Sequence, residues 1–203
     1  MAVDQRHTDS VRRKYNRNAV IYDSMDRMIK EDWRLRVIGQ ARGRVLELGV
    51  GTGKNLPLYD PAVTAELVGI DFSPAMLWRA RQKPCRVPMT LLEMDAQQLT
   101  FDDATFDTVL ATCVFCTVPD PVLGLREARR VCKPNGQILL LEHVRLDRPV
   151  IGPLMDLLDP FAAAVTGTHI NRRTVENVRL AGLHMERVEN IKGDLVKLIQ
   201  ARP

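Results

Sequence analysis

Short apolar runs and amphipathic stretches take turns along the middle of the chain, and this alternation predicts strands separated by helices. Two of the helical stretches begin at cap-and-proline pairs, Ser73-Pro74 and Asp120-Pro121, which suit a helix N-terminus. Such an order gives parallel βαβ units with right-handed crossovers. The runs expected to be strands are 45–48, 66–71, 87–93, 106–112 and 138–142.

The end of the chain predicts two further strands. Residues 184–191 and 194–201 flank Lys192-Gly193, which indicates an antiparallel hairpin. We therefore expect an α/β fold, a Rossmann-like sandwich. Its mostly parallel, seven-stranded sheet would carry the hairpin at its C-terminal end and helices on both faces.

Four other segments have helical signals. Two or three helices are predicted within residues 10–41, the first of them capped by Ser10. Residues 54–59 are expected to form a short helix after the first strand. The last two predictions are an apolar helix pair over 150–166, broken at Pro160, and a final helix capped by Asn171.

The first predicted strand runs into three glycines at alternate positions, Gly49, Gly51 and Gly53, preceded by Glu47. Glycine permits positive φ in a tight turn and lets the backbone approach a ligand closely. The next strand ends at Asp71, about 20 residues later, where an acid meets ribose hydroxyls in nucleotide-binding βαβ units. The two features together predict a nucleoside site.

The sequence does not match two other glycine-rich motifs. A phosphate-binding loop needs Lys-Ser/Thr after its last glycine, but Lys54 precedes Asn55, and Leu48 stands at its first glycine. The dinucleotide pattern fits Gly49 and Gly51 and then meets Lys54. The pattern present, E-x-G-x-G-x-G, resembles the first motif of the class I S-adenosylmethionine-dependent methyltransferases.

Further motifs extend this resemblance over residues 44–142. Asp95-Ala96 follows the third predicted strand, where an acid beside a small residue usually holds the adenine amino group in that family. The resemblance implies that the glycines cradle the methionine end of S-adenosylmethionine and that Asp71 binds its ribose. The cofactor-binding residues implied are Tyr15, Glu47, Gly49, Gly51, Gly53, Asn55, Asp71, Phe72, Ser73, Met76, Asp95, Ala96, Thr112 and Cys113.

Later segments look like one branch of the family, which includes bacterial phosphatidylethanolamine N-methyltransferases and animal thiol S-methyltransferases. The N-terminal Tyr-Asn-Arg and Tyr-Asp are similar to lipid and quinone methyltransferases. The length of the chain suits one α/β domain, expected over residues 1–203. Its expected parts are a basic helical arm (1–43), a cofactor-binding core (44–142), an acceptor-side segment (143–181) and the hairpin (182–203).

His143 ends the fifth predicted strand and could take a proton from an ammonium or thiol acceptor, because its pKa can lie near neutrality. A strand-end residue bonded to backbone is the alternative. Tyr22 and His169 are further catalytic candidates, and Tyr22 could equally serve helix packing. The candidates for acceptor binding are Arg145, for which a surface salt bridge is an equal reading, Asp159 and Phe161.

The net charge of +4 is concentrated at the N-terminus, since residues 1–44 hold eleven Lys/Arg and six Asp/Glu, or 11 − 6 = +5. A basic arm on a nearly neutral body favours an anionic partner such as a membrane surface, although a solvated helix face has the same pattern. Only five Phe in the chain argue against base stacking with nucleic acid.

The four cysteines have no framework spacing, which favours a reducing cytoplasm. No apolar stretch is long enough to span a membrane, and the first residues lack a secretion signal, so a cytoplasmic or peripheral location is expected. Cys113 and Cys116 have redox or zinc spacing, but a second pair is missing. We therefore expect no metal and read Cys113 as a residue lining the cleft.

The function expected is S-adenosylmethionine-dependent methyl transfer, with N-methylation of a phospholipid ethanolamine head group at the membrane surface as the leading hypothesis. A small-molecule thiol S-methyltransferase and a quinone C-methyltransferase are the alternatives with other acceptors. A cofactor-binding module without turnover is the non-enzymatic alternative.

Overall fold

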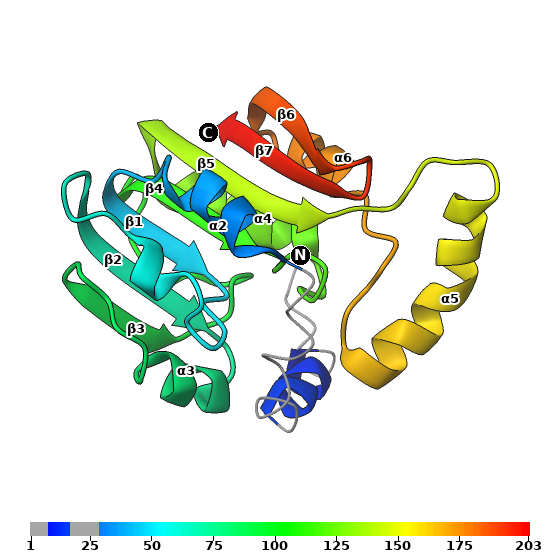
Figure 1. The fold of residues 1–203 in the computed structure, drawn as a ribbon, viewed down its shortest axis with the longest axis horizontal. Coiled ribbons are helices and arrows are strands. Elements are labelled where there is room, and N and C mark those ends of the chain that lie inside the picture. The colour runs from blue at the N-terminus through cyan, green and yellow to red at the C-terminus, as the bar shows by residue number, and fades with distance from the viewer. Residues whose placement is uncertain (1–7, 17–28) are drawn as a thin grey trace.

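A computed structural model describes residues 8–16 and 29–203 (Figure 1). Residues 8–16 are helical. The helices that follow are α2 (Glu31–Ile38), η2 (Leu56–Leu58), α3 (Pro74–Ala80), α4 (Pro121–Val131), α5 (Ile151–Thr166) and α6 (Thr174–Leu180). The strands are β1 (Gly43–Leu48), β2 (Thr64–Asp71), β3 (Met89–Glu93), β4 (Phe106–Thr112), β5 (Cys132–His143), β6 (His184–Lys192) and β7 (Val196–Arg202).

The strands form one seven-stranded sheet in the order β3-β2-β1-β4-β5-β7-β6. Strands β1 to β5 pair in parallel, whereas β7 runs antiparallel to both β5 and β6. The predicted fold class is confirmed. Because the order reverses beside β1, the carboxyl ends of β1 and β4 meet at a switch point, which is where ligands bind in open α/β sheets.

Two apolar layers hold the sheet between helices. One side packs side chains of β1 and β4 such as Leu46 and Val109 against Leu125 of α4 and Val178 of α6. The other side packs alternate positions of the same strands against α2, η2 and α3. Since both faces are covered, most positions of the central strands β1 and β4 are buried.

Two predicted boundaries around the sheet are wrong. The helix expected over 54–59 is only the 3₁₀ turn η2, because Pro57 stands in it and Leu56 is drawn into the core. β5 begins at Cys132 rather than at residue 138. Its register against β4 jumps from Phe106↔Cys132 to Thr108↔Gln137, so the expected turn is a bulge within the strand.

Three helical predictions also need correction. α5 continues through Pro160 as one helix. Both Pro160 and Asp156 are exposed, so the carbonyl that loses its amide partner faces water. Asn171 does not cap α6, whose N-cap is Arg173, and Ser10 lies inside the helical segment 8–16. Tyr22 lies outside the described residues.

Candidate active site

The glycine turn after β1 has backbone conformations that other residues rarely adopt. Gly49, Gly51 and Gly53 have φ values of +60°, +56° and +82°. A Cβ added to Gly49 would lie 2.7 Å from Cγ2 of Val114, so this point admits a backbone and no side chain. Gly53 is packed against α3, where a Cβ would lie 2.9 Å from the Cα of Ala80.

A buried hydrogen-bond network supports this turn from beneath. The carboxylate of Glu47 accepts hydrogen bonds from Asn55 Nδ2 and from the Tyr59 hydroxyl, each at 2.8 Å. Asn55 Oδ1 accepts from Arg34 Nη1, also at 2.8 Å. Burial raises the pKa of Glu47 to about 7, although the hydrogen bonds from Tyr59 and Asn55 oppose it. Glu47 and Asn55 therefore shape the turn, and both border a small polar recess beside Arg34.

Asp71 ties the end of β2 to the glycine turn. Its Oδ2 accepts from the amide of Gly51 and its Oδ1 from the amide of Ser73, both at 2.9 Å. Burial raises the pKa of Asp71 to about 6, against the lowering effect of these two hydrogen bonds. Each oxygen accepts one backbone bond and has a second lone pair, so Asp71 can also accept hydrogen bonds from ligand hydroxyls.

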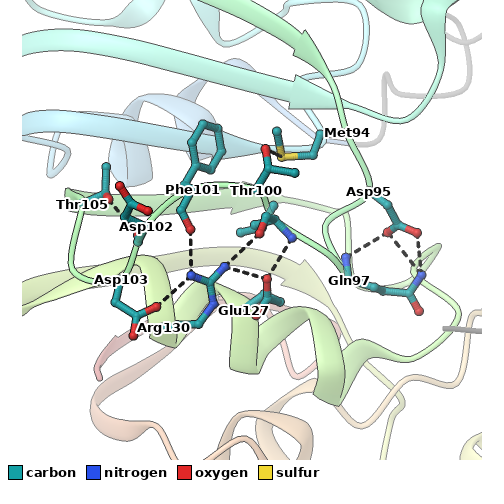
Figure 2. A network of polar contacts seen from close by, with 11 residues as sticks. Met94, Asp95, Gln97, Thr100, Phe101, Asp102, Asp103, Thr105, Glu127 and Arg130 are labelled. Atoms are coloured by element: carbon teal, nitrogen blue, oxygen red, sulfur yellow. Dashed lines mark hydrogen bonds and ion pairs between the residues drawn. The ribbon is translucent and has the colours of Figure 1, made fainter. Parts of the chain in front are cut away.

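The loop after β3 carries Asp95 and Ala96, and side-chain bonds fix its shape. The amide of Gln97 donates to Asp95 Oδ1 at 2.8 Å, and Gln97 Nε2 donates to Oδ2 at 3.0 Å (Figure 2). Gln97 Oε1 accepts from the amide of Asp120 at 2.9 Å, which links this loop to the start of α4. Asp95 is thus held in one orientation.

Arg130 of α4 anchors the remainder of the same loop (Figure 2). Its guanidinium donates to the carbonyl oxygens of Leu99 at 2.9 Å and Phe101 at 2.7 Å. It also pairs with Glu127 and Asp103, each at 2.8 Å. The hydrogen bonds from Arg130 lower the pKa of Glu127, and these pairs together make the loop a fixed wall.

One cavity lies at the switch point, between the glycine turn, the end of β2 and the loops after β3 and β4. We call it the donor cavity, after the methyl donor that the sequence predicts for this edge of the sheet. Ser73 does not line this cavity, because it is fully buried. Its hydroxyl donates to Asn16 Oδ1 at 2.5 Å and caps α3 by accepting from the amide of Met76. The described residues that line the donor cavity are Tyr15, Gly49, Gly51, Ile70, Asp71, Phe72, Met76, Met94, Asp95, Ala96, Thr112, Cys113, Val114, Thr117, Val118 and Pro119.

The chain leaves β4 through a left-handed residue, Cys113, with φ +52°. The turn that follows is held by Glu142 of β5, whose Oε1 accepts from the amides of Val114 at 2.8 Å and Phe115 at 3.2 Å. Burial raises the pKa of Glu142 to about 7, although these two hydrogen bonds lower it. Glu142 therefore sets where Cys113 stands.

A second, mostly apolar cavity of about 380 Å³ adjoins the first, and Tyr15 and Cys113 line both. The Tyr15 hydroxyl lies 3.1 Å from Thr168 Oγ1, and its ring packs on Phe72 at 5.8 Å between centroids. We call this second space the acceptor cavity. The described residues that line it are Tyr15, Ile29, Cys113, Cys116, His143, Met155, Ala162, Thr166, Thr168, Ile170, Lys192, Leu195 and Val196.

His143 stands in the wall of the acceptor cavity at the end of β5. Burial lowers the pKa of His143 below its usual 6.5, and the charge of Asp159 opposes this only in part. The imidazole is therefore neutral at pH 7 and can accept a proton.

The other acceptor-side candidates hold α5 in place. Asp159 accepts from His169 Nδ1 and from the amide of Ile170, each at 2.7 Å. Arg145 pairs with Asp156 at 2.7 Å. Phe161 is 73% exposed and points to solvent rather than into the cavity. Asp159 is therefore turned inward, Asp156 pairs with Arg145 at the surface, and the ring of Phe161 faces outward.

Several lining residues were missed by the sequence reasoning. Thr168 and Ile170 line the acceptor cavity, while His169 between them turns to Asp159. Successive side chains of an extended segment point to opposite sides, so this rule could have predicted that Thr168 and Ile170 share one side and His169 the other. The sequence predicts only a hairpin turn at Lys192. Nothing in the local sequence indicates that this turn lines the same cavity as His143 at the end of β5.

The sites fit the expected donor. Asp71 can accept from ribose hydroxyls, the small Ala96 leaves room for a flat ring, and Gly49 and Gly51 line the cavity without side chains. A seven-stranded sheet with one antiparallel strand, carrying this site at its switch point, defines the class I S-adenosylmethionine-dependent methyltransferases. The chain belongs to this family, and its cofactor is S-adenosylmethionine.

Comparisons with known proteins agree. The family model of a methyltransferase domain matches residues 46–140. The chain is 42% identical over 153 residues to a phosphatidylethanolamine N-methyltransferase of Cereibacter sphaeroides, covering 72% of each chain. It is 31% identical over 178 residues to a demethylmenaquinone methyltransferase of Staphylococcus aureus, covering 82% of this chain and 74% of that one.

The fold also matches solved structures. An S-adenosylmethionine-dependent methyltransferase from Mesorhizobium loti superposes with a TM-score of 0.67 at 21% identity, covering 85% of this chain and 97% of that one. No group of metal-ligating side chains occurs among residues 8–16 and 29–203, and no helix within these ranges is long and apolar enough to cross a membrane. None of the four cysteines, which all lie within residues 29–203, forms a disulfide.

Proposed function

We propose that this methyltransferase N-methylates the ethanolamine head group of a phospholipid at a membrane surface. One observation carries the proposal: an apolar acceptor cavity meets the donor cavity at Tyr15 and Cys113. A mostly apolar cavity suits an acceptor with an acyl chain or ring system. The relative named phosphatidylethanolamine N-methyltransferase supports the choice of head group.

The side chains of the protein need only remove a proton from the acceptor and exclude water from the site. S-adenosylmethionine supplies a methyl group on a sulfonium, which leaves as a neutral thioether. The acceptor must present a free amine lone pair, so its ammonium has to lose a proton before the new N–C bond forms. His143 takes that proton on a ring nitrogen, because its lowered pKa keeps it neutral. Tyr15 and Cys113 exclude water where the two cavities meet.

Lys192 gives the acceptor cavity a charge. Among the described residues that line it, Lys192 is the one lysine and there is no arginine, while His143 has a lowered pKa. An ammonium beside an apolar wall suits an acceptor that carries both a phosphate and acyl chains. The basic N-terminal arm adds attraction to anionic lipid.

A panel assay with labelled S-adenosylmethionine tests this proposal. Phosphatidylethanolamine vesicles, demethylmenaquinone and a small alkyl thiol are offered in turn, and label is counted in each product. Label in mono- or dimethylated phosphatidylethanolamine is expected. The variant Lys192→Gln should raise KM for the phospholipid about tenfold, the worth of one charge-assisted hydrogen bond. Label in the other acceptors alone would refute the proposal.

Quinone C-methylation is the second candidate, because demethylmenaquinone methyltransferases are also among the relatives. A quinone has an apolar tail but no phosphate, so Lys192→Gln should leave its turnover unchanged. The same variant therefore separates the two acceptors.

A further inference from the structure

α5 carries a second apolar stripe that faces away from the protein. Met155, Ala162 and Thr166 occupy the inner side and line the acceptor cavity. The outer side presents Leu154 at 47%, Leu157 at 75%, Leu158 at 48%, Phe161 at 73% and Val165 at 53% exposure. These five positions recur at helical spacing and form one continuous arc, which we call the outer face of α5.

An apolar arc of this width normally faces a core. Here the two acids of α5 are both used on other sides of the helix, Asp156 by Arg145 and Asp159 by His169. The outer face therefore contains no polar side chain among its five positions. A contiguous patch of this kind on a folded protein marks a docking surface.

Cationic groups border one end of this face. Lys14 of the helical segment 8–16 donates to the carbonyl oxygen of Ala163 at 2.9 Å, so this segment touches the C-terminal half of α5. Arg13, beside Lys14, is exposed. In Figure 1 the segment and α5 lie together at the carboxyl edge of the sheet, with α5 set apart from the strands. Apolar side chains next to basic ones are the pattern of a helix in a lipid interface.

We infer that the outer face of α5 is the surface that enters an anionic lipid bilayer and lies in its interface. This rests on the proposed function, because the inner side of the same helix lines the acceptor cavity, which also contains His143. With 16 residues, two of them proline, α5 is too short to span a bilayer and suits a position parallel to it. Docking would bring the acceptor cavity to the lipid surface.

Vesicle flotation with full-length protein tests this inference. The vesicles are phosphatidylcholine with and without phosphatidylglycerol and contain no phosphatidylethanolamine, so binding is measured without turnover. The test variant is Leu154→Ser/Leu157→Ser. The matched control is Trp78→Ser/Leu180→Ser, which removes two side chains exposed at 63% and 58% on α3 and α6. Turnover of a dispersed short-chain phosphatidylethanolamine is measured in parallel.

The wild type and the control variant should float with phosphatidylglycerol vesicles, and the test variant should bind at least about tenfold less, with turnover of the dispersed acceptor retained. Equal flotation of the test variant would overturn the inference, as would a wild type that does not float. The inference would also be overturned if light scattering showed a dimer in the wild type that the test variant loses, while flotation of the two proteins stayed equal. Flotation that depends on α5 without any methylation of phosphatidylethanolamine would keep the inference and refute the proposed acceptor.

Discussion

Asp71 is the residue on which donor binding should depend most. The variant Asp71→Asn replaces one acceptor oxygen by an amide donor that faces a backbone N–H, either of Gly51 or of Ser73. We expect the Kd for S-adenosylhomocysteine to rise about 10- to 100-fold, the worth of a charge-assisted hydrogen bond. Calorimetry measures this, and a cooperative thermal unfolding transition shows that the variant is folded.

The pH dependence of donor binding follows from the same carboxyl group. Its pKa is raised to about 6, so protonation below that pH removes a hydrogen-bond acceptor for the ribose. Affinity in the wild type should fall as pH drops from 7 to 5, which are working values around this pKa, and Asp71→Asn should lack this fall. A wild-type affinity that is flat over this range contradicts the role given to Asp71.

His143 should affect the rate of methyl transfer and leave donor binding unchanged. His143→Gln keeps a polar group in the wall but removes the base, so kcat is expected to fall about 100-fold. The wild-type rate should also fall on the acid side of neutrality, because the pKa of His143 lies below 6.5 and a protonated ring cannot accept a proton. Steady-state kinetics check both, and an unchanged kcat would assign proton removal to another group.

Glu142 joins two elements, β5 and the turn after β4. Its folded-state pKa, about 7, lies above the usual 4.5, so its stability contribution is full below pH 4.5 and is lost as pH rises through 7. Glu142→Gln removes this titration. Its melting temperature should therefore change less between pH 5 and pH 8 than that of the wild type, two conditions on either side of the pKa. Burial also raises the pKa of Glu47 to about 7, so part of the pH dependence of the melting temperature remains in this variant.

Glu127 provides the matched control with the opposite sign. Hydrogen bonds from Arg130 lower its pKa, so its contribution is present above its unfolded pKa and is lost as pH falls. Glu127→Gln should lower the melting temperature at pH 8, a value well above that pKa. Thermal unfolding of both variants decides the matter, and equal slopes in wild type and Glu142→Gln would contradict the account.

Element patterns were predictable where one local rule governs them. β4 was predicted with the observed bounds and α3 and α4 with the observed starts, because period and capping fix them. The course of α5 through Pro160 was not predictable, because it depends on whether the freed carbonyl reaches water. The role of Glu142 was hidden as well, since a buried acid in an apolar run shows nothing of its backbone partners.

At the scale of the whole molecule, two adjoining cavities built from distant segments form the reaction space that we propose. The donor cavity is assembled from strand ends, which a glycine motif and two acids indicate in the sequence. The acceptor cavity is assembled from residues 15, 113, 143, 168 and 192, which only the folded chain brings together. Family motifs therefore indicate residues that line the donor cavity, whereas the lining of the acceptor cavity depends on how α5 and the hairpin are arranged.

The most direct test of this account is to fill the acceptor cavity. Ala162→Trp places a large ring on the inner side of α5, and Ala164→Trp places the same ring on an exposed position of the same helix. Transfer of labelled methyl to phosphatidylethanolamine should fall at least about tenfold in Ala162→Trp and remain unchanged in Ala164→Trp, because overpacking excludes the acceptor. S-adenosylhomocysteine should bind both variants like the wild type. Full transfer activity in Ala162→Trp would contradict the assignment of this cavity to the acceptor.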